Sequence, residues 1–245
     1  MSPAQNLRTV LIVGAAEGSL GEAIHNAVNA VKGLRAVSVG LHNFAAGPES
    51  SHMDITDDQS ITDTMRTVDP HHVIITTGVN RGARMLDDHY AEHMRKSFEV
   101  NTIGPMVALQ KFIVNAVRLH PIRNEKDPMS HFVVISSNSA HIARTGSAPY
   151  CSTKAALSMA LRVAGRETAS ADWLAVYGYE PGLIAGTPMT ADVRTRLGDH
   201  VALHRMPGIV DGLDKIDVAR VVASNLIQDG RIFNGTMHRL DAGEQ

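Results

Sequence analysis

Six short runs of β-branched and other apolar residues recur along the chain, separated by longer stretches with helical spacing. The runs predict strands over residues 9–13, 36–40, 72–78, 131–137, 173–179 and 237–241. The stretches between them predict helices over 21–33, 60–68, about 87–119, 150–168 and near 215–228. Because strands alternate with helices, we expect an α/β fold: a doubly wound, mostly parallel, Rossmann-like sheet with helices on both faces.

Glycine, proline and serine residues indicate where two of these helices bend or begin. Gly104 and Pro105 interrupt the long helical region, so a kink is expected there. Ser147 is the expected cap of the helix that begins at Tyr150, and Pro149 near its start costs no backbone hydrogen bond.

Length and composition indicate one domain over residues 1–245 with no general affinity for nucleic acid or membrane. A chain of 245 residues is common for one α/β domain, and no internal repeat is visible. The net charge of -2 gives no electrostatic reason to bind nucleic acid or anionic lipid. No apolar run approaches the roughly 20 residues of a membrane helix. The start MSPAQNLR lacks the apolar core of a signal peptide, and Cys151 is the only cysteine, so the expected location is the cytoplasm.

Residues 14–21, GAAEGSLG, lie between the first predicted strand and the first predicted helix. A helix N-terminus offers unpaired N–H groups and partial positive charge, and glycine lets the backbone approach a phosphate closely. The stretch therefore predicts a dinucleotide phosphate site. A tight turn that contains three glycines is an equally open interpretation of this motif alone.

Asp54 follows shortly after the second predicted strand, in the stretch MDITDD. A carboxylate there can accept a hydrogen bond from an adenine amino group. The same letters also suit a helix cap, and without other motifs that interpretation is favoured.

Tyr150 and Lys154 stand four residues apart on one predicted helix and therefore share a face. A free tyrosine has a pKa of about 10. A neighbouring ammonium favours the phenolate, so the pair can exchange a proton with an alcohol or a carbonyl. The alternative is a tyrosine and a lysine on a solvated helix face.

Several motifs in their order along the chain resemble the short-chain dehydrogenase/reductase family. The glycine stretch 14–21 resembles that family's glycine loop, and the sequence MDIT its adenine-contacting acid. Ser137 stands thirteen residues before Tyr150, and YCSTK matches the family's Y-x-x-x-K. The remaining matches are TTG (76–78), VNTIG (100–104), PGLIAGT (181–187) and LDAG (240–243).

The resemblance implies roles for particular residues. Tyr150 would be the general acid/base, Lys154 would lower the pKa of that tyrosine and bind the nicotinamide ribose, and Ser137 would hydrogen-bond the substrate oxygen. Asn101 would bend its helix and hold a water of the proton relay. The cofactor-binding residues implied are Gly14, Gly18, Ser19, Leu20, Gly21, Asp54, Ile55, Thr77, Gly78, Tyr150, Lys154, Pro181, Gly182, Ile184 and Thr187. The segment of about 183–213 would form the substrate lid.

Several departures from the family pattern bear on the binding and choice of the cofactor, NAD(P). The third glycine comes one residue late, and by hypothesis the Ser19 hydroxyl compensates on a phosphate; the loop that ends at Thr187 is also one residue longer. Residues 39–43 contain no acid for the ribose hydroxyls, which leans toward NADP. Glu17 would repel a 2′-phosphate, although His42 and Asn43 can contact one.

The expected function is an NAD(P)-dependent oxidoreductase that interconverts a small-molecule carbonyl and a secondary alcohol. A catalytically silent NAD(P)-binding regulatory protein is the alternative from another class. An epimerase or dehydratase of the family's longer branch is disfavoured because the length leaves no separate substrate domain. The resemblance also implies a homodimer or homotetramer through the helices that begin near Asp87 and Tyr150.

Other patterns point to sites only weakly. The histidine pairs 89/93 and 200/204 have helical metal-pair spacing but no third ligand, so surface histidines are expected and no metal is predicted. Cys151 is expected to pack as a structural thiol. The arginines near the expected cleft can steer an anionic substrate or simply face solvent: Arg81, Arg84, Arg144, Arg194, Arg196 and Arg205. The methionines that can line an apolar pocket or pack are Met85, Met189 and Met206.

Overall fold

The structure is a computed structural model that describes residues 7–41, 51–119, 128–197 and 212–241. The roles considered above for His42, Asn43, His200, His204, Arg205 and Met206 therefore fall outside the described residues.

Seven parallel strands form one sheet in the order β3-β2-β1-β4-β5-β6-β7. They are β1 (Arg8–Val13), β2 (Leu34–Gly40), β3 (Ser51–His52), β4 (His72–Ile75), β5 (Ser130–Ile135), β6 (Leu174–Pro181) and β7 (Met237–Leu240). The strand order reverses between β1 and β4, which is where such sheets bind ligands. The six predicted strands are present, but β4 ends at Ile75 and β3 was missed because two residues leave no pattern in the sequence.

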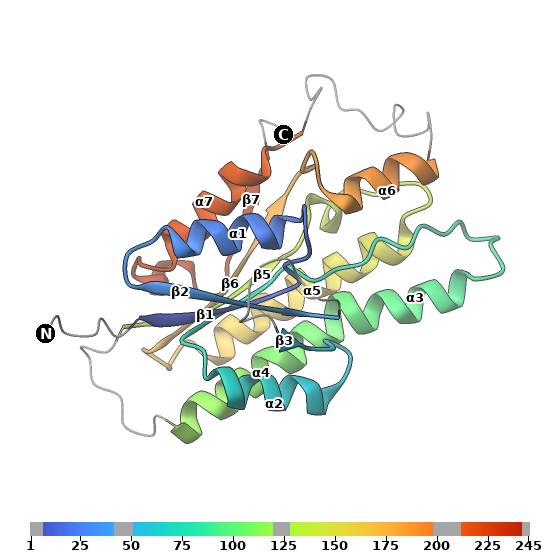
Figure 1. Cartoon of the computed structure of the whole chain (residues 1–245). Helices are drawn as coiled ribbons and strands as arrows, with labels where there is room; N and C mark the ends of the chain where they lie inside the picture. Colours follow the sequence, from blue (N-terminus) through green and yellow to red (C-terminus); the bar gives the residue numbers. More distant parts are fainter. Residues whose placement is uncertain (1–6, 42–50, 120–127, 198–211, 242–245) are drawn as a thin grey trace, which may run out of the picture.

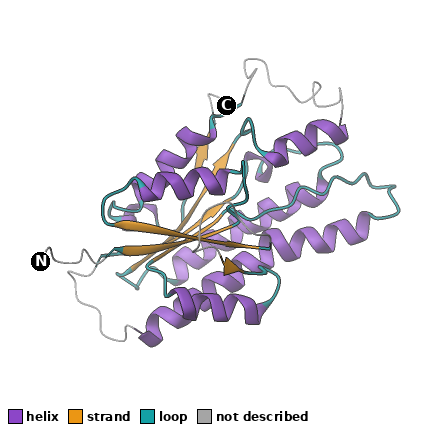
Figure 2. Cartoon of the chain, viewed as in Figure 1, coloured by secondary structure: helices purple, strands orange, loops and turns teal. Residues whose placement is uncertain are grey.

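Helices cover both faces of the sheet, so the doubly wound α/β prediction is confirmed (Figure 1). One face carries α1 (Leu20–Asn29) and α7 (Lys215–Asn225), drawn in blue and red, with α6 (Pro188–Leu197) near the same side. The other face carries α2 (Asp58–Val68), α3 (Tyr90–Phe98), α4 (Gly104–Leu119) and α5 (Ala148–Glu167). Figure 2 shows the strands as one layer between these helices.

The strand sequences explain this sandwich. Both faces of β1 are buried: Val10 and Ile12 pack toward α1 and α7, while Leu11 and Val13 pack toward the opposite helices. A strand buried on both sides needs an unbroken apolar run rather than an alternating one, and residues 10–13 supply it.

The helical region 87–119 departs from regular α-helix about one turn before Gly104 and Pro105, where the kink was expected. A five-residue π-helical turn, Glu99–Ile103, connects α3 to α4, and Gly104 is the first residue of α4. A Cβ at Gly104 would collide with the carbonyl oxygen of Ile55. The glycine therefore allows α4 to pack closely against the chain that follows β3. Ser147 occupies the N-cap position of α5 but makes no side-chain capping bond.

Two buried histidines lie side by side in the middle of the sheet. His72 on β4 and His131 on β5 have ring centroids 5.1 Å apart, and both are almost completely buried. The Nδ1 of His72 accepts a hydrogen bond from the backbone N–H of His131 at 3.2 Å. The Nδ1 of His131 lies 3.1 Å from the Tyr177 hydroxyl. Burial lowers the pKa of His131 to about 4 and holds the pKa of His72 well below its usual value.

We expect these histidines to make the fold sensitive to mild acid. A histidine in the unfolded chain has a pKa near 6.5. Below that pH the unfolded chain binds protons at these two positions, whereas the folded chain does not, because burial lowers the pKa of both histidines. Stability should fall as pH drops from about 6.5 toward 4, with His131 contributing on the order of 3 kcal/mol. Urea unfolding at pH 7.5 and pH 5 measures this. The loss in the free energy of unfolding between pH 7.5 and pH 5 should be smaller in His131→Asn than in the wild type. It should be unchanged in the control His52→Asn, because His52 is exposed. A wild-type loss in His131→Asn would refute the assignment.

Candidate functional site

Residues at the carboxyl ends of the central strands line a cavity of about 830 Å³. Its wall includes segments that follow β1, β2, β3, β4, β5 and β6, which is the expected ligand position in an open parallel sheet. The sequence-predicted residues that line it are Gly14, Ser19, Leu20, Gly21, Asp54, Ile55, Thr77, Gly78, Ser137, Tyr150, Lys154, Pro181, Gly182, Ile184 and Thr187. Gly18 and Asn101 are not part of this wall.

The three glycines of the 14–21 stretch have different structural roles. Gly14 and Gly18 adopt positive φ angles of 98° and 75°, which favour glycine. A Cβ at Gly14 would also lie 2.6 Å from the Thr77 hydroxyl oxygen. Gly21 has no unusual φ, but a Cβ there would lie 2.6 Å from the carbonyl oxygen of Gly14 and from the Thr76 hydroxyl. The late third glycine therefore allows close packing between α1 and the ends of β1 and β4.

The start of α1 presents free N–H groups to the cavity. Ser19 is the N-cap, and its Oγ accepts the N–H of Glu22 at 3.2 Å. The Glu22 carboxylate in turn accepts the N–H of Gly18 at 2.8 Å. In the described chain the N–H groups of Leu20 and Gly21 have no such partner, and both residues line the cavity. This leaves two donors at the positive end of the helix dipole, aimed where an anion can bind.

Thr77 packs directly against the glycine loop. Its Oγ1 is buried and has no hydrogen-bond partner in the described part of the chain, which is rare for a buried hydroxyl. A Cβ at Gly14 would lie 2.6 Å from this oxygen, so only glycine allows the two segments to approach so closely at the edge of the cavity. The free N–H donors of α1 beside this contact suit the pyrophosphate of NAD(P).

Asp54 lines the cavity, whereas another acid caps α2. The Asp54 carboxylate accepts the backbone N–H of Thr56 at 2.8 Å and its hydroxyl at 2.7 Å. The N-cap of α2 is Asp57, which accepts from Gln59 and Ser60. The capping function that Asp54 was considered for thus belongs mainly to Asp57.

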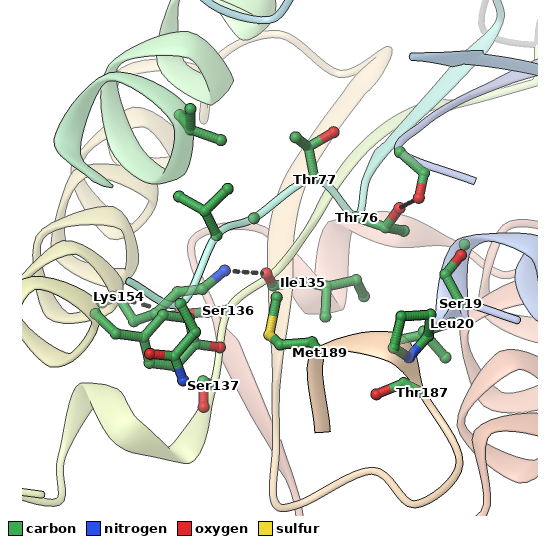
Figure 3. Close-up of a pocket in the computed structure, with 18 of the residues that line it drawn as sticks. Ser19, Leu20, Thr76, Thr77, Ile135, Ser136, Ser137, Lys154, Thr187 and Met189 are labelled. Atoms are coloured by element: carbon green, nitrogen blue, oxygen red, sulfur yellow. Dashed lines mark hydrogen bonds between the residues drawn. The ribbon is translucent and has the colours of Figure 1, made fainter. Parts of the chain in front are cut away.

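Ser137, Tyr150 and Lys154 converge on one side of the cavity. Ser137 lies two residues after the end of β5, and its Oγ accepts the N–H of Ser139 at 3.1 Å. Tyr150 lies in the first turn of α5 and Lys154 one turn later, and all three side chains are buried. In Figure 3, Ser137 and Lys154 lie across the pocket from Ser19 and Leu20 of the glycine loop.

The environment of this group favours a neutral tyrosine. Burial raises the pKa of the Tyr150 phenol, and a hydrogen bond with Ser137 lowers it by a smaller amount. Burial lowers the pKa of the Lys154 ammonium to about 8. The Nζ of Lys154 donates to the carbonyl of Ile135 at 2.9 Å and lies 5.7 Å from the centre of the Tyr150 ring. Lys154 is therefore close to the ring but does not hydrogen-bond the phenol oxygen.

Asn101 lies behind the cavity wall in the middle of the π-helical turn. Its Oδ1 accepts the N–H of Val79 at 2.8 Å, and its Nδ2 donates to the carbonyl of Val79 at 2.9 Å and to the Thr153 hydroxyl at 3.0 Å. The side chain therefore ties the loop after β4 to α5, the helix of Tyr150 and Lys154. The predicted association of Asn101 with an irregular helix agrees with its place in the turn.

Lys215, at the start of α7, is a residue near the site that no motif indicated. Its Nζ donates to the carbonyl of Gly18 at 2.8 Å and to that of Gly186 at 3.5 Å. It thus joins the glycine loop to the loop after β6. A lysine at the first position of the last predicted helix was visible in the sequence, but the contact spans 197 residues.

Of the arginines and methionines expected near the cleft, some line the cavity and others do not. Arg81, Arg144 and Met189 line the cavity, whereas Arg84, Met85 and Glu17 do not. The side chains of Arg194 and Arg196 lie outside the described part of the structure. Cys151 is half-buried, with its Sγ 3.5 Å from the carbonyl of Ile142, away from the cavity.

Within the described ranges, no group of three or more His, Cys, Asp or Glu side chains is placed to hold a metal ion. No helix in those ranges has both the length and the apolar character needed to cross a membrane.

A family model described as short chain dehydrogenase matches residues 8–198. The chain belongs to the short-chain dehydrogenase family. Members of this family use NAD(P), so membership supports an NAD(P)-dependent oxidoreductase that acts on a small molecule. No curated protein matches the sequence of this short-chain dehydrogenase significantly.

Solved structures show the same fold at low sequence identity. A short chain dehydrogenase family protein from Francisella tularensis is 15% identical, with a TM-score of 0.79 over 97% of this chain and 98% of that one. Actinorhodin polyketide ketoreductase with NADPH is 19% identical, with a TM-score of 0.81 over 98% and 97%. Aldohexose dehydrogenase from Thermoplasma acidophilum is 18% identical, with a TM-score of 0.78 over 98% and 94%. At these identities the likeness of this short-chain dehydrogenase to them concerns the fold.

Proposed function

We propose that this chain reduces a carbonyl compound, or oxidises the corresponding secondary alcohol, with Tyr150 as general acid/base. The observation that carries the proposal is that Ser137, Tyr150 and Lys154 share one cavity with the glycine loop. The nicotinamide cofactor, when bound, supplies or accepts the hydride. The protein supplies orientation and the proton.

The roles of the side chains follow from their surroundings. Tyr150 donates its hydroxyl proton to the carbonyl oxygen, and its raised pKa keeps it in the protonated form that reduction needs. Ser137 donates a hydrogen bond to the same oxygen and holds it in position. Lys154 remains mostly protonated below about pH 8 and stabilises the phenolate that forms when the proton leaves. Asn101 positions α5 through Thr153.

The glycine loop and its neighbours would hold the dinucleotide. Leu20 and Gly21 offer backbone N–H groups to the pyrophosphate, and Ser19 can add its hydroxyl proton. Asp54 and Ile55 would meet the adenine, and Thr187 with Ile184 would meet the nicotinamide. NADP is the favoured form because Gly40 and Leu41 line the cavity where an NAD enzyme carries an acid.

The proposal extends to the assembly and location of the protein. We assign residues 1–245 to one domain with the segment of about 183–213 as the substrate lid; residues 198–211 of that segment lie outside the described part of the chain. Exposed apolar side chains on α4 and α5 suit packing against a second copy of the chain in a homodimer or homotetramer: Val114, Val117, Met159 and Val163. A single free cysteine agrees with a cytoplasmic enzyme.

Lys215→Met should weaken dinucleotide binding. Without the ammonium, the carbonyls of Gly18 and Gly186 lose their shared donor and the two loops are no longer tied together. We expect the Kd for NADPH to rise roughly tenfold, with partial recovery in Lys215→Arg. Calorimetric titration measures this, with the exposed Lys32→Met as the matched control. An unchanged Kd in Lys215→Met would remove Lys215 from the site.

Consumption of NADPH with a panel of aldehydes, ketones and oxo acids tests the proposed reaction. Turnover of at least one compound, slower by a factor of about 100 or more in Tyr150→Phe, is the expected result. A protein that binds the dinucleotide but turns over nothing would instead be the silent regulatory protein.

A further inference from the structure

A guanidinium group lies beside the proposed proton donor and takes no part in the chemistry described so far. Arg144 precedes α5 and lines the cavity together with Ser137, Ser139 and Tyr150. Its positive charge opposes, by a small amount, the rise that burial causes in the pKa of the Tyr150 phenol. Arg144 is therefore at the catalytic end of the cavity.

Only neutral groups hold this guanidinium in place. Its Nε donates to the Ser139 hydroxyl at 3.3 Å, and its Nη2 donates to the Oδ1 of Asn138 at 3.4 Å. Both bonds are long, and neither partner carries a charge. In the described part of the chain no carboxylate forms an ion pair with Arg144. A half-buried arginine that is oriented but not neutralised is a ready partner for an anion.

The charges around the rest of the cavity point the same way. Four cationic side chains and two carboxylates line the described wall: Arg81, Lys96, Arg144, Lys154, Asp54 and Glu99. Because Lys96 is already paired with Glu92 at 2.8 Å, the formal excess is one positive charge. Asp54 follows β3, and three strands separate β3 from β5, which leads to Ser137. At the usual spacing of about 4.8 Å per strand, the two strands are roughly 19 Å apart. Asp54 is therefore too distant to neutralise Arg144, and the buried carboxylate of Glu180 is hydrogen-bonded to His141 and Ser158 instead.

We propose that Arg144 binds a carboxylate of the substrate, so that the compound reduced is an oxo acid and the alcohol oxidised is a hydroxy acid. One guanidinium with neutral neighbours matches the charge of a carboxylate better than that of a dianionic phosphate. Two N–H groups of the planar fork can grip both carboxylate oxygens, which would hold the carbonyl in a fixed direction relative to Tyr150 and Ser137. This inference rests on the proposed function and adds a substrate class to it.

The test compares matched substrates in matched variants. Initial rates with NADPH are measured for 2-, 3- and 4-oxo acids and for the methyl ester of each, which removes the charge and keeps the carbonyl. In Arg144→Gln, kcat/KM should fall about 10- to 100-fold for the preferred oxo acid and change less than about threefold for its ester. Arg144→Lys keeps the charge without the fork and should give an intermediate loss. Arg220→Gln removes the same charge from the exposed face of α7 and should match the wild type.

Equal losses for acid and ester would overturn the inference, because Arg144 would then act on Tyr150 rather than on the substrate. No loss for either would overturn it as well. Thermal unfolding followed by circular dichroism establishes that Arg144→Gln is folded before the rates are compared.

A binding measurement separates failure of this inference from failure of the proposed function. The protein, alone and saturated with NADPH, is titrated with propionate, a single carboxylate, in a calorimeter. If no carbonyl compound is turned over, the proposed function fails, yet propionate binding that Arg144→Gln abolishes would still support the anion site. Absence of propionate binding at millimolar concentrations in the wild type would overturn the site.

Discussion

Tyr150→Phe is expected to lower turnover by about 100- to 10,000-fold while the Kd for the dinucleotide stays within about twofold. The substitution removes only the hydroxyl that gives the proton, and general acid catalysis contributes factors of this size. The ring and its buried packing remain. Steady-state rates on the best substrate found, together with a calorimetric Kd, measure both quantities.

Tyr90→Phe is the matched control, because Tyr90 begins α3 and does not line the cavity. It should keep the wild-type rate. Full activity in Tyr150→Phe would show that another group supplies the proton, and the roles assigned to Ser137 and Lys154 would lose their basis.

Gly21→Ala is expected to raise the Kd for the dinucleotide roughly 100-fold and to lower stability by about 1–3 kcal/mol. The new methyl would lie 2.6 Å from the Gly14 carbonyl oxygen and 2.8 Å from the Cα of Ala15. Backbone atoms cannot step aside cheaply, so the start of α1 must shift and carry its free N–H groups with it. Calorimetry gives the Kd, and urea unfolding gives the stability.

Asn26→Ala, at an exposed position of the same helix, controls for general effects on α1. It should leave the Kd unchanged. If Gly21→Ala bound the dinucleotide as tightly as the wild type, the displaced third glycine would have no part in phosphate binding.

The strands and the parallel sheet were predictable because they follow from local patterns. Apolar runs such as residues 10–13 fit only strands buried on both faces, and the helical stretches between them require parallel crossovers. The two-residue β3 and the helix α6 were not predicted, since the first is too short for a pattern and the second is mostly polar. The family resemblance implied a bend at Asn101, but neither its π-helical form nor the bonds of Asn101 to Val79 and Thr153, which lie in distant parts of the chain, were predicted.

The sequence allowed us to predict which residues line the site, but it did not allow us to predict their hydrogen-bond partners. Motif spacing brought Ser137, Tyr150 and the glycine loop to one expected edge of the sheet, and the cavity contains them. The partner of the Lys154 ammonium, a backbone carbonyl of β5, leaves no sequence signal. The same is true of Lys215, which reaches the glycine loop only because α7 packs beside α1.

Calorimetric titration of the full chain with NADPH and then NADH tests most directly whether GAAEGSLG holds a dinucleotide phosphate. We expect one site per chain, with NADPH bound more tightly than NADH and a Kd in the micromolar range. Absence of binding by either dinucleotide at millimolar concentrations would contradict the proposed function, because the glycine loop would then be only a turn between β1 and α1.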